Sequence, residues 1–181
     1  MKPRTTLRKA LSDPKLLGNT LMGPSWAAWK TLLIASMGEK LTDDERKIFR
    51  QLTQREHEPG KRIEEMAAVV GRRGGKSRAI SVLVSYLATL CQHPSLVPGE
   101  TGIVLIFAPD RRQSAVVLDY CYAALTNSPM LRQLVTNRVQ DTIILSNHIN
   151  ITVQVLADLN AKREALVARG HELAVRVSQL L

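Results

Sequence analysis

The sequence predicts an α/β fold, in which a partial parallel sheet is flanked by helices. Two short apolar runs, residues 66–70 and 103–108, have the length and composition of buried strands. The second run is apolar at every position, which is typical of a parallel strand covered on both faces. A glycine-rich stretch and a segment of helical apolar period separate the two runs, so we expect one right-handed βαβ unit.

Composition limits the class of protein. With 181 residues, 45% of them hydrophobic, the chain can bury one core. It has no run of about 18 apolar residues and no signal peptide, so we expect no membrane partner and a cytoplasmic location. Cys91 and Cys121 fall in apolar helical stretches without a CxxC spacing, and we expect buried thiols. The net charge of +9 favours a polyanionic partner.

Two segments are expected before the first apolar run. Residues 1–24 are basic and contain several prolines and glycines, which predicts an irregular arm that is either a DNA contact or a solvated tail. Residues 25–62 predict a helical lead-in of two helices. The first carries Trp26 and Trp29 at helical spacing, an arrangement more typical of a core than of a stacking platform. The second begins with a capping box at residues 42–45.

Residues 63–154 predict the core of the fold, and its chemistry is concentrated in the glycine-rich stretch. The backbone N–H groups of such a turn, and the positive end of the helix that follows, bind phosphate oxygens. Lys76 would neutralise the β- and γ-phosphates, and the Ser77 hydroxyl would hold Mg²⁺. The usual spacing G-x-x-x-x-G-K-[ST] requires a glycine where this chain has Val70; here Gly71 comes one position late. The alternative is a glycine-rich turn followed by an exposed lysine.

The second half of the chain predicts a helix cap, a hairpin and a C-terminal helix. Asp110 can cap the helix that follows the second strand, and residues 142–145 and 149–154 read as the two strands of a β-hairpin. Residues 155–181 predict an amphipathic helix that docks on its own domain, although a loosely ordered tail or a dimerising zipper fits the same pattern. Its stripe consists of leucines at every seventh position, Leu159, Leu166, Leu173 and Leu180.

Several short motifs occur together in one order along the chain. They are Asp13-Pro14, Leu17-Gly18, Ser25-Trp26 to Trp29, Gly38, Leu41-Thr42, Glu45 to Phe49, Leu52-Thr53-Gln54-Arg55, Gly71-Arg72-Arg73-Gly74-Gly75-Lys76-Ser77 and Ala108-Pro109-Asp110-Arg111-Arg112-Gln113. In this order they resemble the N-terminal ATPase half of a phage terminase large subunit, the motor that translocates and cuts viral DNA during packaging. The resemblance covers roughly residues 13–153 and implies a partial sheet of the P-loop NTPase type.

The resemblance also implies ligands and partners. ATP and Mg²⁺ are the implied cofactors, bound by residues 71–77, and Arg72 is implied to stabilise charge on the γ-phosphate, a role that Arg73 could serve equally. Gln54 and Arg55 match the position of an adenine-side contact in the family. The implied partners are double-stranded DNA, a terminase small subunit and a portal protein, in the cytoplasm of a bacterial host that carries the phage or prophage. The resemblance leaves open whether the chain forms a homo-oligomer.

One part of the family pattern is missing. In the family, the hairpin leads into an apolar strand that ends in Asp-Glu, whose carboxylates hold Mg²⁺ through water and polarise the attacking water. No such strand follows Val153, and the nuclease domain is missing as well. We therefore expect ATP binding without hydrolysis by this chain alone, and a truncated or frameshifted terminase with family sequence to about residue 154. Without its later strands, the sheet would have an open edge and an uncovered apolar face.

Two other interpretations are kept. One is another P-loop ATPase, such as a helicase-like DNA translocase; the lead-in with Trp26 and Trp29 and the absence of helicase-type motifs argue against it. The other is a non-catalytic protein that binds DNA through its basic arm and dimerises through its leucine stripe.

Overall fold

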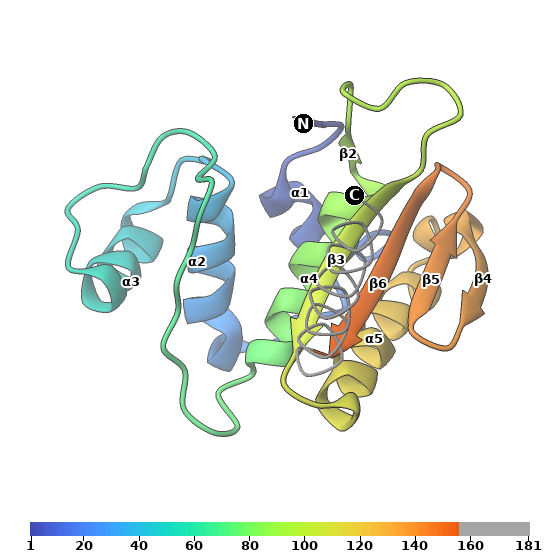
Figure 1. The fold of residues 1–181 in the computed structure, drawn as a ribbon. Helices are drawn as coiled ribbons and strands as arrows, with labels where there is room; N and C mark the ends of the chain where they lie inside the picture. Colours follow the sequence, from blue (N-terminus) through green and yellow to red (C-terminus); the bar gives the residue numbers. More distant parts are fainter. Residues whose placement is uncertain (156–181) are drawn as a thin grey trace, which may run out of the picture.

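The fold is α/β, with a mixed four-stranded sheet, two helices on one face of it, and a helical N-terminal part beside those helices (Figure 1). The computed structural model describes residues 1–155, so the predicted C-terminal helix lies, except for Val155, outside the described residues. None of the helices in this part of the chain has the length and apolar character needed to cross a membrane. In chain order the elements are β1 (Lys2–Pro3), α1 (Leu7–Ser12), the 3-10 turn η1 (Pro24–Trp26), α2 (Ala27–Ser36), α3 (Asp43–Thr53), α4 (Lys76–Thr89), β2 (Cys91–Gln92), β3 (Gly102–Ala108), α5 (Arg111–Thr126), the 3-10 turn η2 (Leu131–Leu134), β4 (Val135–Val139), β5 (Thr142–Leu145) and β6 (Ile149–Val155).

The main sheet has the strand order β3-β6-β5-β4. β3 and β6 are parallel, with Val104 opposite Ile151 and Ala108 opposite Val155. β5 and β6 form the antiparallel hairpin that the sequence predicted. β4, which the sequence analysis did not predict, pairs antiparallel with β5. The sheet is therefore mixed, and the chain between its parallel strands β3 and β6 contains α5, η2, β4 and β5.

The predicted first strand, residues 66–70, is wrong. These residues have no regular structure and belong to neither of the two sheets in the described part of the chain. Most of their side chains are exposed, and that of Val69 is fully exposed. An apolar run becomes a strand only where a neighbouring strand pairs with its backbone groups, and this segment has none. The predicted βαβ unit is therefore also wrong, because the parallel neighbour of β3 is β6.

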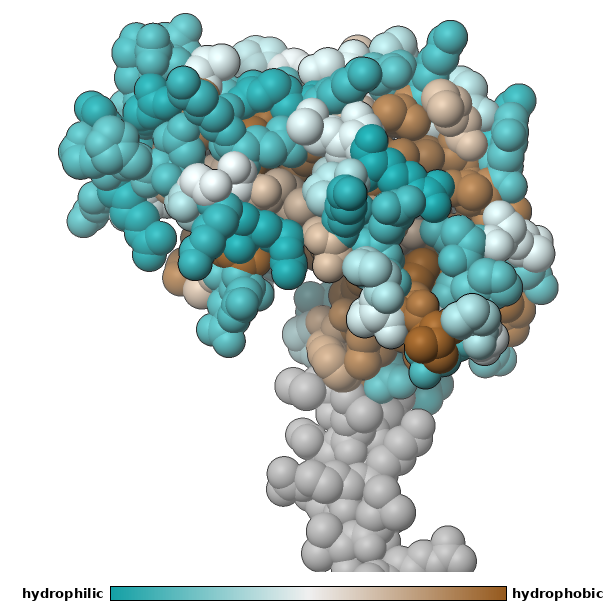
Figure 2. Space-filling view, turned by 90° about the horizontal axis from the view of Figure 1, so that it is seen from above, coloured by the Kyte–Doolittle hydropathy of each residue, from teal (hydrophilic) through white to brown (hydrophobic). Residues whose placement is uncertain are grey.

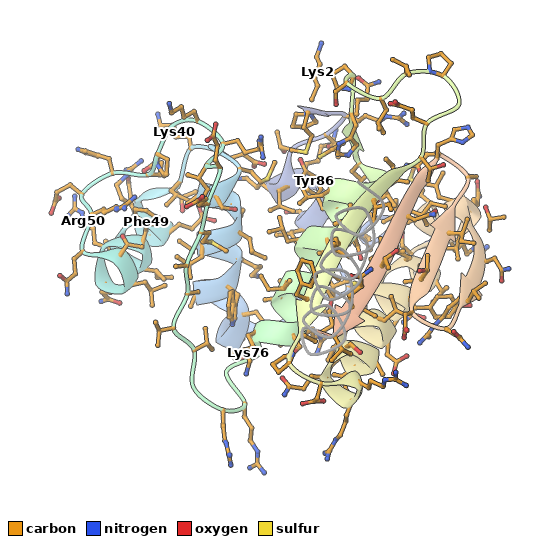
Figure 3. The ribbon with its side chains drawn as sticks, in the orientation of Figure 1. Lys2, Lys40, Phe49, Arg50, Lys76 and Tyr86 are labelled. Atoms are coloured by element: carbon orange, nitrogen blue, oxygen red, sulfur yellow. The ribbon has the colours of Figure 1, made fainter. Side chains whose placement is uncertain are left out.

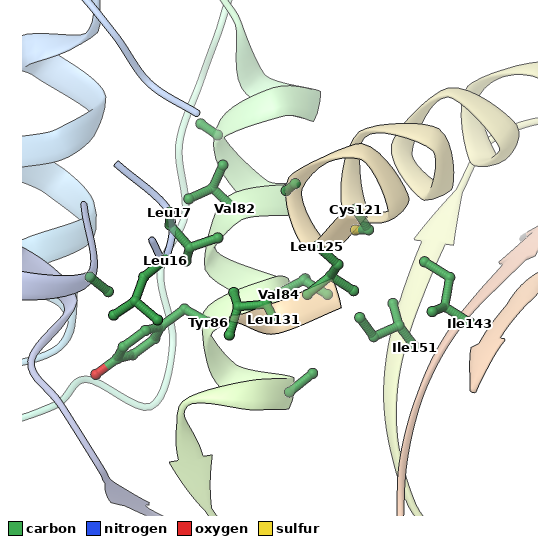
Figure 4. Close-up of a cluster of buried hydrophobic side chains, with 14 of the residues drawn as sticks. Leu16, Leu17, Val82, Val84, Tyr86, Cys121, Leu125, Leu131, Ile143 and Ile151 are labelled. Carbon is green, nitrogen blue, oxygen red and sulfur yellow. The ribbon is translucent and has the colours of Figure 1, made fainter. Parts of the chain in front are cut away.

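Small residues allow α4 and α5 to approach each other closely on one face of the sheet. Cys121 Sγ lies 3.7 Å from the carbonyl oxygen of Ser81, and Ser81 Oγ lies 3.0 Å from that of Val117. Figure 4 shows apolar side chains, Ile151 of β6 among them, filling the core between these helices and the sheet. Cys91 and Cys121 are buried free thiols, as predicted, and burial raises the pKa of Cys121 to about 11.

The opposite face of the sheet is open along β3. Val104 and Ile106 of this strand are half-buried, whereas Ile103, Leu105 and Phe107 are 63%, 43% and 53% exposed. The prediction that β3 is covered on both faces is therefore wrong. β3 is also an edge strand in the described sheet, as expected for a sheet with an open edge and an uncovered apolar face. Figure 2 shows a mainly hydrophilic surface over α2 and α3, and apolar residues gathered on the half that holds the sheet.

Residues 1–24 contain regular structure and join the core, which differs from the irregular arm predicted. β1 pairs with β2, and α1 buries Leu7 and Ala10 completely. Tyr86, in the second half of α4, donates a hydrogen bond from its hydroxyl to Thr5 O at 2.7 Å. The prolines and glycines of this segment limit the length of its elements without preventing them.

The helical lead-in is confirmed. The capping box at the start of α3 joins Thr42 N to Glu45 Oε2 at 2.8 Å and Glu45 N to Thr42 Oγ1 at 3.3 Å. Glu58 fixes the loop after α3, because its carboxylate pairs with the Arg46 guanidinium at 3.2 Å and accepts the N–H of Leu41 at 2.9 Å. The Arg46 guanidinium, followed by the Leu41 N–H, lowers the pKa of Glu58 to about 2.

Substituting Glu58→Gln tests this pair. Because the pKa of Glu58 is depressed on folding, its contribution to stability is complete above the ordinary value of 4.5 and is lost as the pH falls through about 2. We expect the variant to have a free energy of unfolding lower by about 1–3 kcal/mol at pH 7. The difference from the wild type should shrink between pH 4.5 and pH 2, as measured by urea denaturation.

The matched control is Glu56→Gln, because Glu56 and its partner Arg50 are 74% and 50% exposed. An exposed ion pair of this kind contributes less than about 1 kcal/mol, so the control should change little at any pH. Equal effects of the two variants would contradict the role given to Glu58.

Candidate functional site

The glycine-rich loop, residues 71–75, lies at the end of the sheet where β3 and β6 finish. In Figure 1, the coil that follows α3 passes beside α2 and enters this loop at the lower end of α4, where α5 also begins. Figure 3 places Lys76 at this lower end of α4. In α/β proteins, ligands bind outside the carboxyl ends of parallel strands. The loop therefore lies at the edge of the sheet where a ligand site is expected.

The loop forms a tight turn, as predicted. Gly74 N donates to Gly71 O at 3.2 Å. The positive φ angles occur at Arg73, with 61°, and at Gly75, with 76°, so only the second of these left-handed positions carries a glycine. Gly74 is needed for space, because a Cβ at that position would lie 2.4 Å from Val70 Cγ1.

Two tryptophans of the lead-in hold the loop. The indole Nε1 of Trp29 donates a hydrogen bond of 2.7 Å to Gly74 O. The Trp26 ring packs against Gly75 so closely that a Cβ there would lie 2.8 Å from the ring. On α4, the Arg78 guanidinium lies 5.1 Å from the centroid of the Trp26 ring, a cation–π distance. The start of α4 is thus packed against the beginning of the lead-in, at η1 and the first turn of α2.

The sequence analysis missed this role of the tryptophans. Trp29 is 8% exposed and belongs to the core, as the sequence indicated. Its hydrogen bond to Gly74 spans 45 positions along the chain, and nothing in the local spacing of Trp26 and Trp29 identifies a partner at that distance. The available signal was an indole N–H on a buried ring, which requires a hydrogen-bond acceptor.

The first turn of α4 has free backbone donors. Gly75 is its N-cap residue and carries no side chain to accept the first N–H groups of the helix. The first turn contains no acidic residue, and the cationic side chains of Arg72, Arg73 and Lys76 around it are exposed. An uncapped helix N-terminus surrounded by cations favours a bound anion such as a phosphate group.

The residues present fit an anion better than a metal ion. Ser77 is half-buried and offers one hydroxyl oxygen, so Mg²⁺ would need phosphate oxygens and water for its other ligands. Within residues 1–155, no three His, Cys, Asp or Glu side chains form a group that could hold a metal. Asp110 is a helix cap, as predicted: its carboxylate accepts the Gln113 N–H at 2.9 Å, which lowers its pKa.

Of the two residues expected on the adenine side, Arg55 lines a cavity and Gln54 does not. Gln54 ends α3 with a left-handed φ of 58° and is exposed. Arg55 lines a cavity of about 320 Å³ between α2, α3 and the segment that leads to the loop. Phe49 and residues 66–68 line the same cavity, so the structure brings Arg55 and this segment together, while Gln54 is not among the lining residues.

Comparisons of the chain with protein-family models, with curated proteins and with solved structures found no match. The function therefore has to be inferred from the chemistry of the loop and its surroundings.

Substituting Gly75→Ala tests the packing of the loop against Trp26. Alanine at this position would have to adopt a φ of 76° and would place its Cβ 2.8 Å from the ring. Gly60→Ala is the matched control, because Gly60 has a φ of 68° and nothing within 4 Å of an added Cβ. We expect Gly75→Ala to lower the free energy of unfolding by about 1–3 kcal/mol more than the control does.

Urea denaturation followed by tryptophan fluorescence measures this difference, and the emission of the folded protein should change only in Gly75→Ala. Equal losses of stability in the two variants would show that the ring does not pack on the loop.

Proposed function

We propose that this chain is the ATP-binding portion of a terminase-type motor, which moves viral DNA into capsids. The observation that carries the proposal is the uncapped N-terminus of α4, with Lys76 as its first residue and a glycine-rich loop leading into it. The order of loop, Lys76 and Ser77 in the sequence supports the same assignment. The fold that accompanies the proposal is a partial one of the P-loop NTPase type, in which the segment before the loop is a coil.

Each residue of the loop has a role in the proposal. The backbone N–H groups at the start of α4 donate to phosphate oxygens, and the Lys76 ammonium offsets the charge of the β- and γ-phosphates. The Ser77 hydroxyl is the protein ligand for Mg²⁺, which offsets part of the phosphate charge when it is bound. Arg72 lies farthest from the helix among these cations in the sequence and is the proposed contact to the γ-phosphate, and Arg73, which is equally exposed, is the alternative.

The base of the nucleotide would occupy the cavity lined by Arg55. This cavity of about 320 Å³ includes residues 66–68, which run directly into the loop. Its volume falls within the usual range for small-molecule sites. Phe49 and the aliphatic residues of the lining would contact the faces of a purine, and Arg55 would stack on it or donate to its ring nitrogens.

We propose nucleotide binding without hydrolysis by this chain alone. Hydrolysis requires an oriented water and charge stabilisation at the γ-phosphate. Among the described residues, no three His, Cys, Asp or Glu side chains form a group that could hold a metal ion, and the sequence after Val153 contains no Asp-Glu pair. Double-stranded DNA is the proposed polyanionic partner, supported by the net charge of +9, and a terminase small subunit and a portal protein are the proposed protein partners.

Substituting Lys76→Ala tests the phosphate site directly. Loss of a charge-assisted hydrogen bond of about 1.5–3 kcal/mol should weaken Mg-ATP binding by roughly 10- to 100-fold, as measured by titration calorimetry. Lys40→Ala is the control, because Lys40 is an exposed lysine at the opposite end of the molecule in Figure 3. Phosphate release should be absent in all three proteins. Unchanged affinity in Lys76→Ala, in a folded sample, would contradict the proposal.

Comparing Arg72→Ala with Arg73→Ala identifies the arginine at the γ-phosphate. If Arg72 contacts that group, Arg72→Ala should weaken binding of ATP by about tenfold more than binding of ADP. In that case, Arg73→Ala should affect both nucleotides equally, because Arg72 alone would contact the group that ADP lacks. Affinities for the two nucleotides, measured on both variants, separate the roles; the reverse pattern would transfer the role to Arg73.

A further inference from the structure

A second cavity, of about 210 Å³, lies between α4, α5 and the segment that joins α1 to η1. None of its lining residues belongs to the glycine-rich loop or to the cavity lined by Arg55. Its apolar lining consists of Leu16, Val82, Ala123 and Ala124. It is therefore a candidate binding site separate from the nucleotide site proposed above.

Arg78, in the first turn of α4, is the charged residue of this lining. Its side chain is half-buried, and two contacts fix its guanidinium group. One Nη2 hydrogen bond goes to Thr20 O, and Cζ lies over the Trp26 ring, 5.1 Å from its centroid. Within residues 1–155, no Asp or Glu side chain forms an ion pair with Arg78. A guanidinium group held at a cavity wall without a counterion favours an anionic ligand, and its planar donors match a carboxylate.

The opening of the cavity carries further polar groups. The hydroxyl of Tyr120 and the side-chain amide of Asn127 line it and make no hydrogen bond within the described residues. Both side chains are exposed, whereas Val82 and Ala124 in the interior are buried. An apolar interior with a few polar groups that fix orientation is the usual composition of a small-molecule site.

We propose that this cavity binds a small carboxylate whose apolar body is about the size of one aromatic ring. The Arg78 guanidinium pairs with the carboxylate, and Leu16 and Val82 contact the ring. The volume sets the size of the ligand. An apolar cavity of about 150 Å³ is large enough for benzene, and sites for drug-sized ligands have about 300–1,000 Å³. The cavity of about 210 Å³ thus accepts one ring with its carboxylate.

A ligand on Arg78 would also affect the glycine-rich loop, because Trp26 contacts both. The Trp26 ring lies under the Arg78 guanidinium and packs against Gly75, where an added Cβ would lie 2.8 Å from the ring. A carboxylate that pairs with Arg78 changes the electrostatic environment of this ring. We therefore expect the indole N–H signal of Trp26 to shift when the ligand binds.

Titration of the full chain with benzoate, followed by NMR of a ¹⁵N-labelled sample, tests the proposal. Benzoate combines a carboxylate with one ring, and benzamide is the neutral control of the same shape. We expect benzoate to bind with a dissociation constant of about 1 mM or lower, and benzamide to bind at least about tenfold more weakly. Arg78→Gln should remove this preference for the carboxylate.

Ala123→Leu tests the cavity while keeping Arg78. Ala123 is an exposed lining residue of α5, and leucine is a good helix former, so the variant should fold and obstruct the cavity. Ala115→Leu is the matched control, because Ala115 is exposed on the same helix and does not line the cavity. We expect benzoate binding to be lost in Ala123→Leu and retained in Ala115→Leu.

Three results would each overturn the proposal: no saturable binding of benzoate by the wild type, equal affinity for benzamide, or binding that Ala123→Leu leaves unchanged. The titration contains no nucleotide, so its outcome is independent of whether the loop binds Mg-ATP.

Discussion

The hydrogen bond from the Trp29 indole to Gly74 O is the contact on which the candidate site depends. The only strand before the glycine-rich loop in the described structure is the two-residue β1, which pairs with β2 and not with the main sheet, so the main sheet does not hold the first half of the loop. The loop is instead held from the lead-in, where Trp29 is buried in the core and Trp26 packs over Gly75. The geometry at the start of α4 thus follows from the packing of α2 against it, and the lead-in is part of the site.

Two surfaces remain without protein partners in the described chain, and they differ in chemistry. The first is the start of α4, where free N–H groups and exposed cations favour an anion. The second is the β3 face, where large apolar side chains are exposed. The loop is at the carboxyl end of β3, and these exposed side chains are on the face opposite α4 and α5.

Sequence analysis predicted local structure well, because the chemistry that decides it lies within a few residues. The capping box of α3, the Asp110 cap of α5 and the β5–β6 hairpin are examples. The predictions were wrong or incomplete where the structure of a segment depends on a neighbour that is distant in the sequence. Residues 66–70 are as apolar as a strand, but no strand pairs with them; β3 is apolar on both faces, but helices cover one. The partner of Trp29, 45 residues away, could not be read from local spacing either.

The chain has two tryptophans, so a ¹⁵N-labelled sample gives two indole N–H signals that report directly on the loop. The Trp29 N–H is bonded to Gly74 O, and in the described structure the Trp26 N–H makes no hydrogen bond. One signal should therefore exchange with solvent slowly, disappear in Trp29→Phe, and shift when Mg-ATP is added. Rapid exchange of both signals, or a Trp29 signal that Mg-ATP leaves unchanged, would contradict a loop held by the lead-in and used to bind phosphate.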